Sequence, residues 1–394
     1  MTAGTDRLHA LDAVRAFALL LGIVLHATMS FFLPVPALDS SQSVTLGVVF
    51  YVIHIFRMSA FYLIAGFFAR MVLERKGFEA FAKDRAKRIL IPMFGSYIPL
   101  FVLTLPIIIV GLLLTVDTEV LNSAPEDEGG IPLLHLWFLY YLAIFYIVAL
   151  GLRWLFRNVL DRSGAIRRLV DVVIRFLLRG YVGPILFAAP LAYVLYNDPD
   201  WMAWLGVPTP EVVGLQLSAF AGFGVAFGVG WIIHRQIGMI NEWQKRWIGN
   251  LIIAVVLTAA SLNIVGLSPG NVLDPDALSA MTTVPGPEWA RAVYVVCYTL
   301  AIWYWTFGII GAALQYFSEP NQTIRYIADS SYWLYLAHLP LVYLFAVALA
   351  LVPIHWSIKF ALILGASMWL LLLTYKYWVR NTWLGALLNG RRRK

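Results

Sequence analysis

Long apolar runs recur along the whole chain, and this feature most constrains how it can fold. There are about ten of them, each long enough to cross a bilayer as a helix. The fifth and seventh are the shortest and are flanked by Pro or Gly. With 61% hydrophobic and 13% charged residues, the chain is far more apolar than a soluble domain. We therefore predict an all-α fold class, a polytopic membrane helical bundle of about ten transmembrane helices in a single integral-membrane domain over residues 1–394. The approximate limits of the runs are residues 8–33, 45–69, 89–116, 132–155, 181–197, 212–234, 247–266, 291–317, 330–352 and 356–379.

Charged residues divide the connecting loops into two alternating sets. One set begins with residues 34–43 and is acidic, with no Lys or Arg before Arg291. The other set is rich in Lys and Arg, and the chain ends in the basic sequence GRRRK. Because positive loops mark the cytoplasmic side, the sequence predicts a multi-pass protein with both termini cytoplasmic. The net charge of +7 then reflects orientation in the bilayer, and no nucleic-acid partner is expected. The acidic set comprises Asp39, Asp117, Glu119, Glu126, Asp127, Glu128, Asp198, Asp200, Glu211, Asp274, Asp276 and Glu288.

The first apolar run and the longest basic loop each allow a further prediction. The first apolar run lacks a clear cleavage site and is interpreted as a retained span, not a signal peptide. The basic loop over residues 157–180 contains IRRLVDVVIRFLLR, which places apolar residues on one helix face and arginines on the other. This pattern predicts an amphipathic helix at the membrane surface.

The first span carries three polar residues that hydrocarbon does not tolerate without a reason: Asp12, Arg15 and His26. Arg15 and His26 are eleven residues apart, which returns them to within about 20° of each other on a helix and separates them by about 16 Å. The helix face that carries both residues should therefore point toward protein or a water-filled cavity. Arg15 and His26 would then lie at two different depths in the membrane. Asp12 is expected to pair with Arg15. His26 suits a general base near neutral pH, although a histidine hydrogen bonded between helices is the alternative.

In the second span, His54 and Arg57 are three residues apart and share a helix face. Counted from the outer ends, His26 and His54 lie at nearly the same depth, so we predict one cavity lined by His26, His54 and Arg57. No acidic residue lies at the matching depth. Arg57 should therefore bind an anionic ligand, unless it is a structural residue bonded to carbonyl groups.

Three further spans add candidates. Arg85 and Arg88 lie at the cytoplasmic start of the third span, where they could bind phosphates or simply anchor the helix. His135 and Trp137 begin the fourth span at its outer end, where an aromatic belt or a sugar-stacking site is expected. His338 is placed in the inner half of the ninth span, too deep to lie beside His26, in a donor channel or in packing.

Several catalytic motifs are missing from the sequence. The chain has no Walker P-loop, no HExxH and no Gly-x-Ser-x-Gly elbow. Its one cysteine, Cys297, excludes an intrachain disulfide and a cysteine zinc cluster, and the seven histidines are scattered. The sequence therefore indicates neither a metal site nor a covalent serine mechanism.

Five segments, in this order, resemble the membrane acyltransferase-3 family: LDAVRAFALLLGIVLH, IHIFRMSAFYLIAGFFA, RAKRILIPM, HLWFLYYL and SSYWLYLAHLPL. The resemblance runs from about Leu11 to the tenth span. It implies a bacterial inner-membrane enzyme that moves an acyl group, with succinyl favoured, from cytoplasmic acyl-CoA to hydroxyls of a periplasmic glucan. It also implies an essential role for His26 and donor binding by Arg15, Arg85 and Arg88. Four other positions match the family motifs without settled roles: His54, Arg57, His135 and His338.

These expectations combine into a through-membrane acyl transfer in the lipid bilayer, with acyl-CoA as a co-substrate and no permanently bound cofactor. His26 would take the proton of the attacking hydroxyl, and a covalent acyl-histidine is the alternative chemistry. Three other functions stay open: O-acetylation of another surface polysaccharide, transport of glycans or lipids, and transport of small anions. The sequence leaves the choice between a monomer and a homodimer open.

Overall fold

The computed structural model describes residues 3–117, 130–269 and 284–389. The regular secondary structure of these residues is helical, apart from an isolated bridge between Pro132 and Val212, which confirms the all-α prediction. The acidic residues of 118–129 and 270–283 and the whole basic tail, residues 390–394, lie outside the described ranges. The helices are α1 (Ala3–Thr28), α2 (Val44–Lys76), α3 (Phe78–Arg85), α4 (Ile91–Thr115), α6 (Trp137–Leu155), α7 (Ala165–Leu178), α8 (Gly183–Asn197), α9 (Leu217–Ala219), α10 (Val225–Ile233), α11 (Ile240–Val265), α13 (Glu288–Tyr316), α14 (Gln322–Ala350), α15 (Trp356–Thr374) and α16 (Trp383–Asn389).

Short 3-10 and π segments begin, join or extend these helices, except for η5 (Ala203–Leu205), a 3-10 segment that lies in the loop between α8 and α9. The other 3-10 segments are η1 (Met29–Phe31), η3 (Leu134–Leu136) and η7 (His234–Met239). The π segments are η2 (Ala86–Leu90), η4 (Phe156–Leu160), η6 (Phe220–Gly224) and η8 (Tyr375–Val379).

The helices make the chain a multi-pass membrane protein. In the described ranges, eight helical stretches are long and apolar enough to span a bilayer, or nine with the bent pair α7–α8. One stretch, Leu217–Val265, has 49 residues, and Gln236 within it leaves the helical conformation. A continuous helix of that length would measure about 75 Å, against about 30 Å of hydrocarbon, so α10 and α11 are separate crossings. With this division and the bent pair included, one segment overlaps each of the ten predicted apolar runs.

The fifth predicted run is a weaker span than the others. Its helix, α8, has only 15 residues and meets α7 at an angle of 103°. The preceding α7 is the amphipathic helix that the sequence predicts. It buries Ile174 and Leu177 against the bundle, whereas the side chain of Phe176 is 73% exposed.

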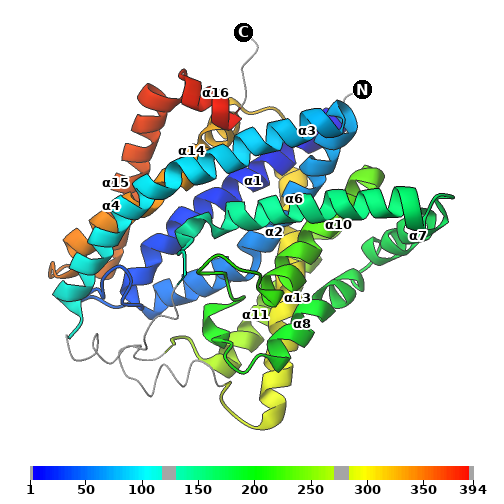
Figure 1. Ribbon diagram of the computed structural model, residues 1–394. Coiled ribbons are helices and arrows are strands. Elements are labelled where there is room, and N and C mark those ends of the chain that lie inside the picture. The colour runs from blue at the N-terminus through cyan, green and yellow to red at the C-terminus, as the bar shows by residue number, and fades with distance from the viewer. Residues whose placement is uncertain (1–2, 118–129, 270–283, 390–394) are drawn as a thin grey trace.

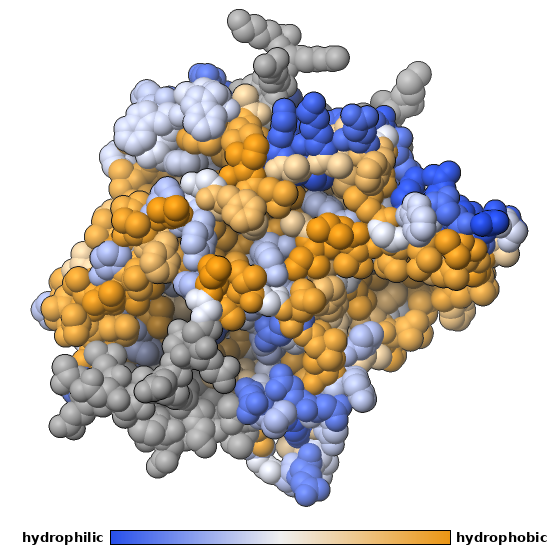
Figure 2. All heavy atoms as spheres, in the orientation of Figure 1, coloured by the Kyte–Doolittle hydropathy of each residue, from blue (hydrophilic) through white to orange (hydrophobic). Residues whose placement is uncertain are grey.

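The outer surface has the polarity of a membrane protein. The beginning of α1 lies near α3 and α16 at one end of the bundle, which we call the terminal face, and the opposite end is the loop face (Figure 1). Figure 2 shows a broad hydrophobic band between two ends where hydrophilic residues gather. The band includes the outward side of α4, where Phe94 and Ile98 are exposed.

The centre of the bundle is built around α2 and α13, which are the most buried spans. The helices α2 and α10 approach closely because glycines lie at their contact. A Cβ atom on Gly66 would overlap the carbonyl of Phe227, and one on Gly230 would overlap the carbonyl of Leu63. Small residues at such crossings let helix backbones pack tightly in lipid.

A fully buried ion pair ties the loop after α1 to the last long span. Lys359 Nζ lies 2.7 Å from Asp39 Oδ1, and both side chains are 0% exposed. The same ammonium donates to the carbonyl of Ala350 at 3.0 Å and to Ser40 Oγ at 3.2 Å. The pair therefore fixes the loop-face ends of α14 and α15 against the loop that follows α1.

Candidate functional site

A cavity of about 200 Å³, which we call the arginine cavity, opens on the terminal face. Arg15, Arg85 and Arg88 all line it, so the structure brings together the three arginines that were expected to bind the donor. Arg15 pairs with Asp12 at 3.1 Å, as predicted, on α1. Sequence reasoning missed Asp84, which lies 2.7 Å from Arg85 and 3.3 Å from Arg88 and holds the two guanidinium groups together.

A second, much smaller space lies deeper in the bundle. This histidine cavity has a volume of about 30 Å³, enough for two or three waters, each of which needs roughly 10–15 Å³. It is enclosed by α1, α2, α14 and the start of α6. Its lining residues are Ala18, Leu19, His26, Arg57, Met58, Phe61, His135, Trp137, Phe138, Tyr335 and His338.

Three imidazoles meet at the histidine cavity. The ring centroid of His338 lies 5.1 Å from that of His26 and 5.0 Å from that of His135. His26 is half-buried, whereas His135 and His338 are 5% and 1% exposed. The three rings therefore form a continuous polar cluster inside an apolar bundle.

The hydrogen bonds of two of these rings fix their tautomers. His338 Nδ1 lies 2.6 Å from the carbonyl oxygen of Tyr335, and His135 Nε2 lies 3.2 Å from that of Leu336. Because a carbonyl oxygen only accepts, each of these nitrogens carries a hydrogen, which leaves His338 Nε2 and His135 Nδ1 as acceptors in the neutral rings. Neither acceptor has a partner among the described residues, nor does His26 Nδ1.

The predicted separation of His338 from His26 is wrong. The sequence placed the ninth span at residues 330–352, but α14 begins at Gln322 and ends at Ala350. The earlier start puts His338 close to the middle of the helix instead of in its inner half. Tyr335, one turn before His338, lines the same cavity and was also missed, although the spacing Tyr-x-x-His is visible in the sequence.

His54 does not line the histidine cavity, which corrects the prediction that it shares one cavity with His26 and Arg57. It lines a space of about 560 Å³ on the loop face, which we call the loop-face cavity. The reason is geometric, since residues three apart on a helix differ by about 60° in direction and about 4.5 Å in height. His54 packs against Phe50 with ring centroids 5.1 Å apart.

Residues 200–216 form most of the loop-face cavity, although no function was predicted for this segment from the sequence. The cavity includes the carboxylates of Asp200 and Glu211, whereas Trp201 beside them is 1% exposed. Gly206 has a φ of +89°, and a Cβ atom there would come within 2.7 Å of Tyr298 Oη. The dense Trp, Pro and Gly content of the segment was the available signal of a shaped loop.

Arg57 has no partner of opposite charge among the residues that the structure describes. Within the described ranges no carboxylate lies within 4 Å of it, and its Nε is enclosed without a hydrogen bond. Gly22 on α1 provides its space, because a Cβ atom there would overlap the guanidinium group. Hydrogen bonds from Arg57 to carbonyl groups, the structural alternative, are not seen among the described residues.

Trp137 is half-buried and packs against the core of the bundle. It lines the histidine cavity and stacks on Phe223 with ring centroids 5.7 Å apart. The ring is therefore placed beside the imidazole cluster.

The three cavities follow one another along α2. The loop-face cavity touches His54, the histidine cavity touches Arg57 and Phe61, and the arginine cavity touches Phe61 and Phe68. The histidine and arginine cavities share a wall made of Leu19, Phe61 and Phe138. From residue 50 to residue 68 the helix advances by eighteen steps and rises by about 27 Å, which is close to the thickness of the hydrocarbon core.

Within the described ranges, no group of three or more His, Cys, Asp or Glu side chains has the arrangement of a metal site. The ring nitrogens of the three clustered imidazoles that have no partner among the described residues can accept a proton or a hydrogen bond. Together with Arg57 they form a site that can move a proton next to a fixed positive charge.

Comparison with known proteins places these features in a family. Residues 8–376 match the acyltransferase domain of the acyltransferase-3 family. The chain is similar to glucans biosynthesis protein C of Escherichia coli, with 30% identity over 171 residues, which cover 40% of this chain and 42% of that protein. It is also similar to glucans biosynthesis protein C of Salmonella paratyphi B, with 28% identity over 275 residues, which cover 59% of this chain and 68% of that protein. No solved structure matches the chain.

Proposed function

This chain belongs to the acyltransferase-3 family, and on that premise we propose that it transfers an acyl group from acyl-CoA to a hydroxyl of a glucan on the other side of the membrane. Succinyl is the favoured acyl group, the termini face the cytoplasm, and the membrane is the bacterial inner membrane. The acceptor class follows from the name of the similar proteins, glucans biosynthesis protein C.

The observation that carries the proposal is the series of three cavities along α2. The arginine cavity opens where a soluble donor would arrive, and the loop-face cavity opens on the opposite end of the bundle. The imidazole cluster lies between them. A donor and an acceptor that enter from opposite sides would therefore meet at the only described group of bases between the two cavities.

In this scheme the arginine cavity binds the phosphates of the donor. The guanidinium groups of Arg15, Arg85 and Arg88 suit phosphate oxygens because each can donate two parallel hydrogen bonds. The narrow pantetheine arm would then extend toward the histidine cavity. The shared wall of Leu19, Phe61 and Phe138 must move aside for the thioester to pass, since the histidine cavity holds only about 30 Å³.

His26 acts as the general base. It takes the proton of the acceptor hydroxyl while the hydroxyl oxygen attacks the thioester carbonyl. A carbon–oxygen bond forms, the carbon–sulfur bond breaks, and the proton goes to the departing CoA thiolate. Help of this kind typically contributes about 10²–10⁴-fold to the rate. His338, in contact with His26, positions the imidazole.

Arg57 provides acyl-group selectivity. Its guanidinium has no carboxylate partner among the described residues, and a succinyl group would bring one. The acceptor would lie in the loop-face cavity, where Asp200 and Glu211 can accept hydrogen bonds from sugar hydroxyls.

The direct test is an assay of the purified full-length protein in proteoliposomes, with succinyl-CoA and a periplasmic glucan. We expect glucan-dependent release of CoA, which falls at least about 100-fold in His26→Ala. The matched control is His9→Ala, on the same helix but outside all three cavities. Glucan or anion movement without CoA release would contradict the proposal and favour a transporter.

A further inference from the structure

A second basic pocket lies on the terminal face, outside the route from donor to acceptor. It has a volume of about 390 Å³ and lies between α2, α6, α7 and α10. We propose that this pocket binds the headgroup of an anionic phospholipid from the adjacent leaflet. It shares no lining residue with the arginine cavity. On α2, Arg70 of this pocket and Phe68 of the arginine cavity point about 160° apart, because successive residues turn by about 100°.

The pocket carries more positive than negative charge. Arg70 pairs with Glu74 at 2.8 Å, and Arg153 lies 3.8 Å from the same carboxylate. Glu74 is the only acidic residue in the lining, whereas five arginines line it. Counting the carboxylates that these arginines contact, the cluster retains two uncompensated positive charges. The groups are Arg70, Arg153, Arg157, Arg167 and Arg235 against Glu74, Asp161 and Asp171.

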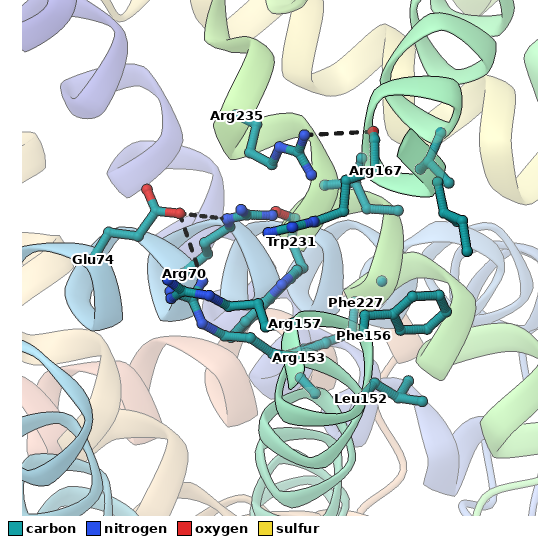
Figure 3. A pocket seen from close by; sticks show the side chains of 15 residues that line it. Arg70, Glu74, Leu152, Arg153, Phe156, Arg157, Arg167, Phe227, Trp231 and Arg235 are labelled. Atoms are coloured by element: carbon teal, nitrogen blue, oxygen red, sulfur yellow. Dashed lines mark hydrogen bonds and ion pairs between the residues drawn. The ribbon is translucent and has the colours of Figure 1, made fainter. Parts of the chain in front are cut away.

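The opposite side of the pocket is apolar. Figure 3 shows the guanidinium groups gathered on one side, with Phe227, Phe156 and Leu152 on the other. Gly228 leaves the floor open, because a Cβ atom there would meet no heavy atom within 4 Å. A headgroup phosphate followed by acyl chains has this same division between charge and hydrocarbon.

The surroundings of the pocket favour a lipid over a soluble anion. The amphipathic helix α7 forms one wall and exposes apolar side chains, including Leu169 at 63%. On α6, the lining residue Leu152 is 50% exposed and Trp154 beside it is 62% exposed. The pocket therefore opens at the level where headgroups meet acyl chains, and its excess of guanidinium groups disfavours headgroups that carry an ammonium.

The test measures the stability of the purified full-length protein in detergent, by its thermal unfolding midpoint, as lipid is added. We expect phosphatidylglycerol to raise the midpoint in a saturable way and phosphatidylcholine to leave it unchanged. Arg157→Gln removes the one lining arginine that has no ion pair among the described residues, and Gly228→Leu fills the pocket without changing its charge. Each variant should weaken the apparent phosphatidylglycerol affinity at least tenfold.

Arg168→Gln is the matched control, because Arg168 lies on α7, is exposed and does not line the pocket. It should bind phosphatidylglycerol as the unchanged protein does. Equal loss of affinity in Arg168→Gln and Arg157→Gln would overturn the proposal, as would an equal effect of phosphatidylcholine. Inorganic phosphate or CoA that reproduces the shift, and loses it in Gly228→Leu, would show a site for a soluble anion and would overturn the lipid assignment.

Discussion

Arg57 is a guanidinium held in the bundle without a counter-charge in the described structure. Its space exists because residue 22 of α1 is glycine. Leaving a buried charge unpaired costs several kcal/mol, so the arrangement is expected to have a use. An acyl group with a terminal carboxylate would complete the pair.

Replacing Arg57 by Met should impair succinyl transfer more than acetyl transfer. A charge-assisted hydrogen bond contributes about 1.5–3 kcal/mol, which corresponds to roughly 10–100-fold in kcat/KM for the succinyl donor alone. The measurement compares kcat/KM for succinyl-CoA and acetyl-CoA in the same preparation. Losses of the same size with both donors would show that Arg57 does not recognise the terminal carboxylate of the acyl group.

At the scale of elements, the apolar runs and the amphipathic α7 could be predicted because hydrophobicity and its period are local properties of the sequence. The depth of His338 could not, because it depends on where α14 begins, and Gln322 lies eight residues before the predicted start of the span. The separation of His54 from Arg57 depends on what packs on each side of α2. Loop 200–216 shapes its cavity through contacts that no local pattern records.

The start of α7 is secured by one carboxylate. Asp161 accepts hydrogen bonds from the backbone N–H groups of Ile166 at 3.0 Å and Arg167 at 2.8 Å, and from Arg167 Nε at 2.9 Å. Burial acts to raise the pKa of Asp161, but these hydrogen bonds outweigh it and hold the pKa below its ordinary value. A depressed pKa means that the stabilisation is complete above the ordinary Asp pKa, about 3.9, and is lost as the pH falls through the folded-state value.

Replacing Asp161 by Asn should therefore loosen the first turn of α7 at neutral pH. Amide hydrogen exchange of Ile166 and Arg167, corrected for intrinsic rates, should be several-fold faster in the variant at pH 7, because the carboxylate accepts these two N–H groups through its two oxygens, whereas an amide has one acceptor oxygen and no charge. The difference should shrink as the pH falls below the pKa of the folded state. Ser163→Ala is the control, since its hydroxyl accepts only a 3.4 Å bond from Ala165. A difference that persists unchanged at low pH would show that the carboxylate charge is not responsible.

At the scale of the whole molecule, the three cavities form an interrupted path across the bundle. The interruption between the arginine and histidine cavities is the apolar wall of Leu19, Phe61 and Phe138. Such a wall keeps the two aqueous sides apart while no donor is present. Passage of the thioester through this wall is then a step that can be measured separately from donor binding.

Enlarging that wall should slow transfer without weakening donor binding. Leu19→Trp adds bulk where the two cavities meet and leaves Arg15, Arg85 and Arg88 in place. We expect kcat to fall at least about tenfold, by obstruction of the route that positions the thioester, whereas the Kd for CoA should change less than twofold. Isothermal titration with CoA and the CoA-release assay separate the two quantities. A parallel loss of CoA affinity would show that the wall is part of the donor site itself.

The pair formed by Asp39 and Lys359 joins positions 320 residues apart in the chain. A ribosome synthesises the first loop long before the final long helix. Asp39 therefore has no Lys359 to pair with during most of synthesis. A polypeptide cut short before α15 would keep that acid without its cation, at a cost of several kcal/mol for an enclosed charge. An unpaired Asp39 carboxylate thus distinguishes the unfinished protein from the complete one until Lys359 packs against it.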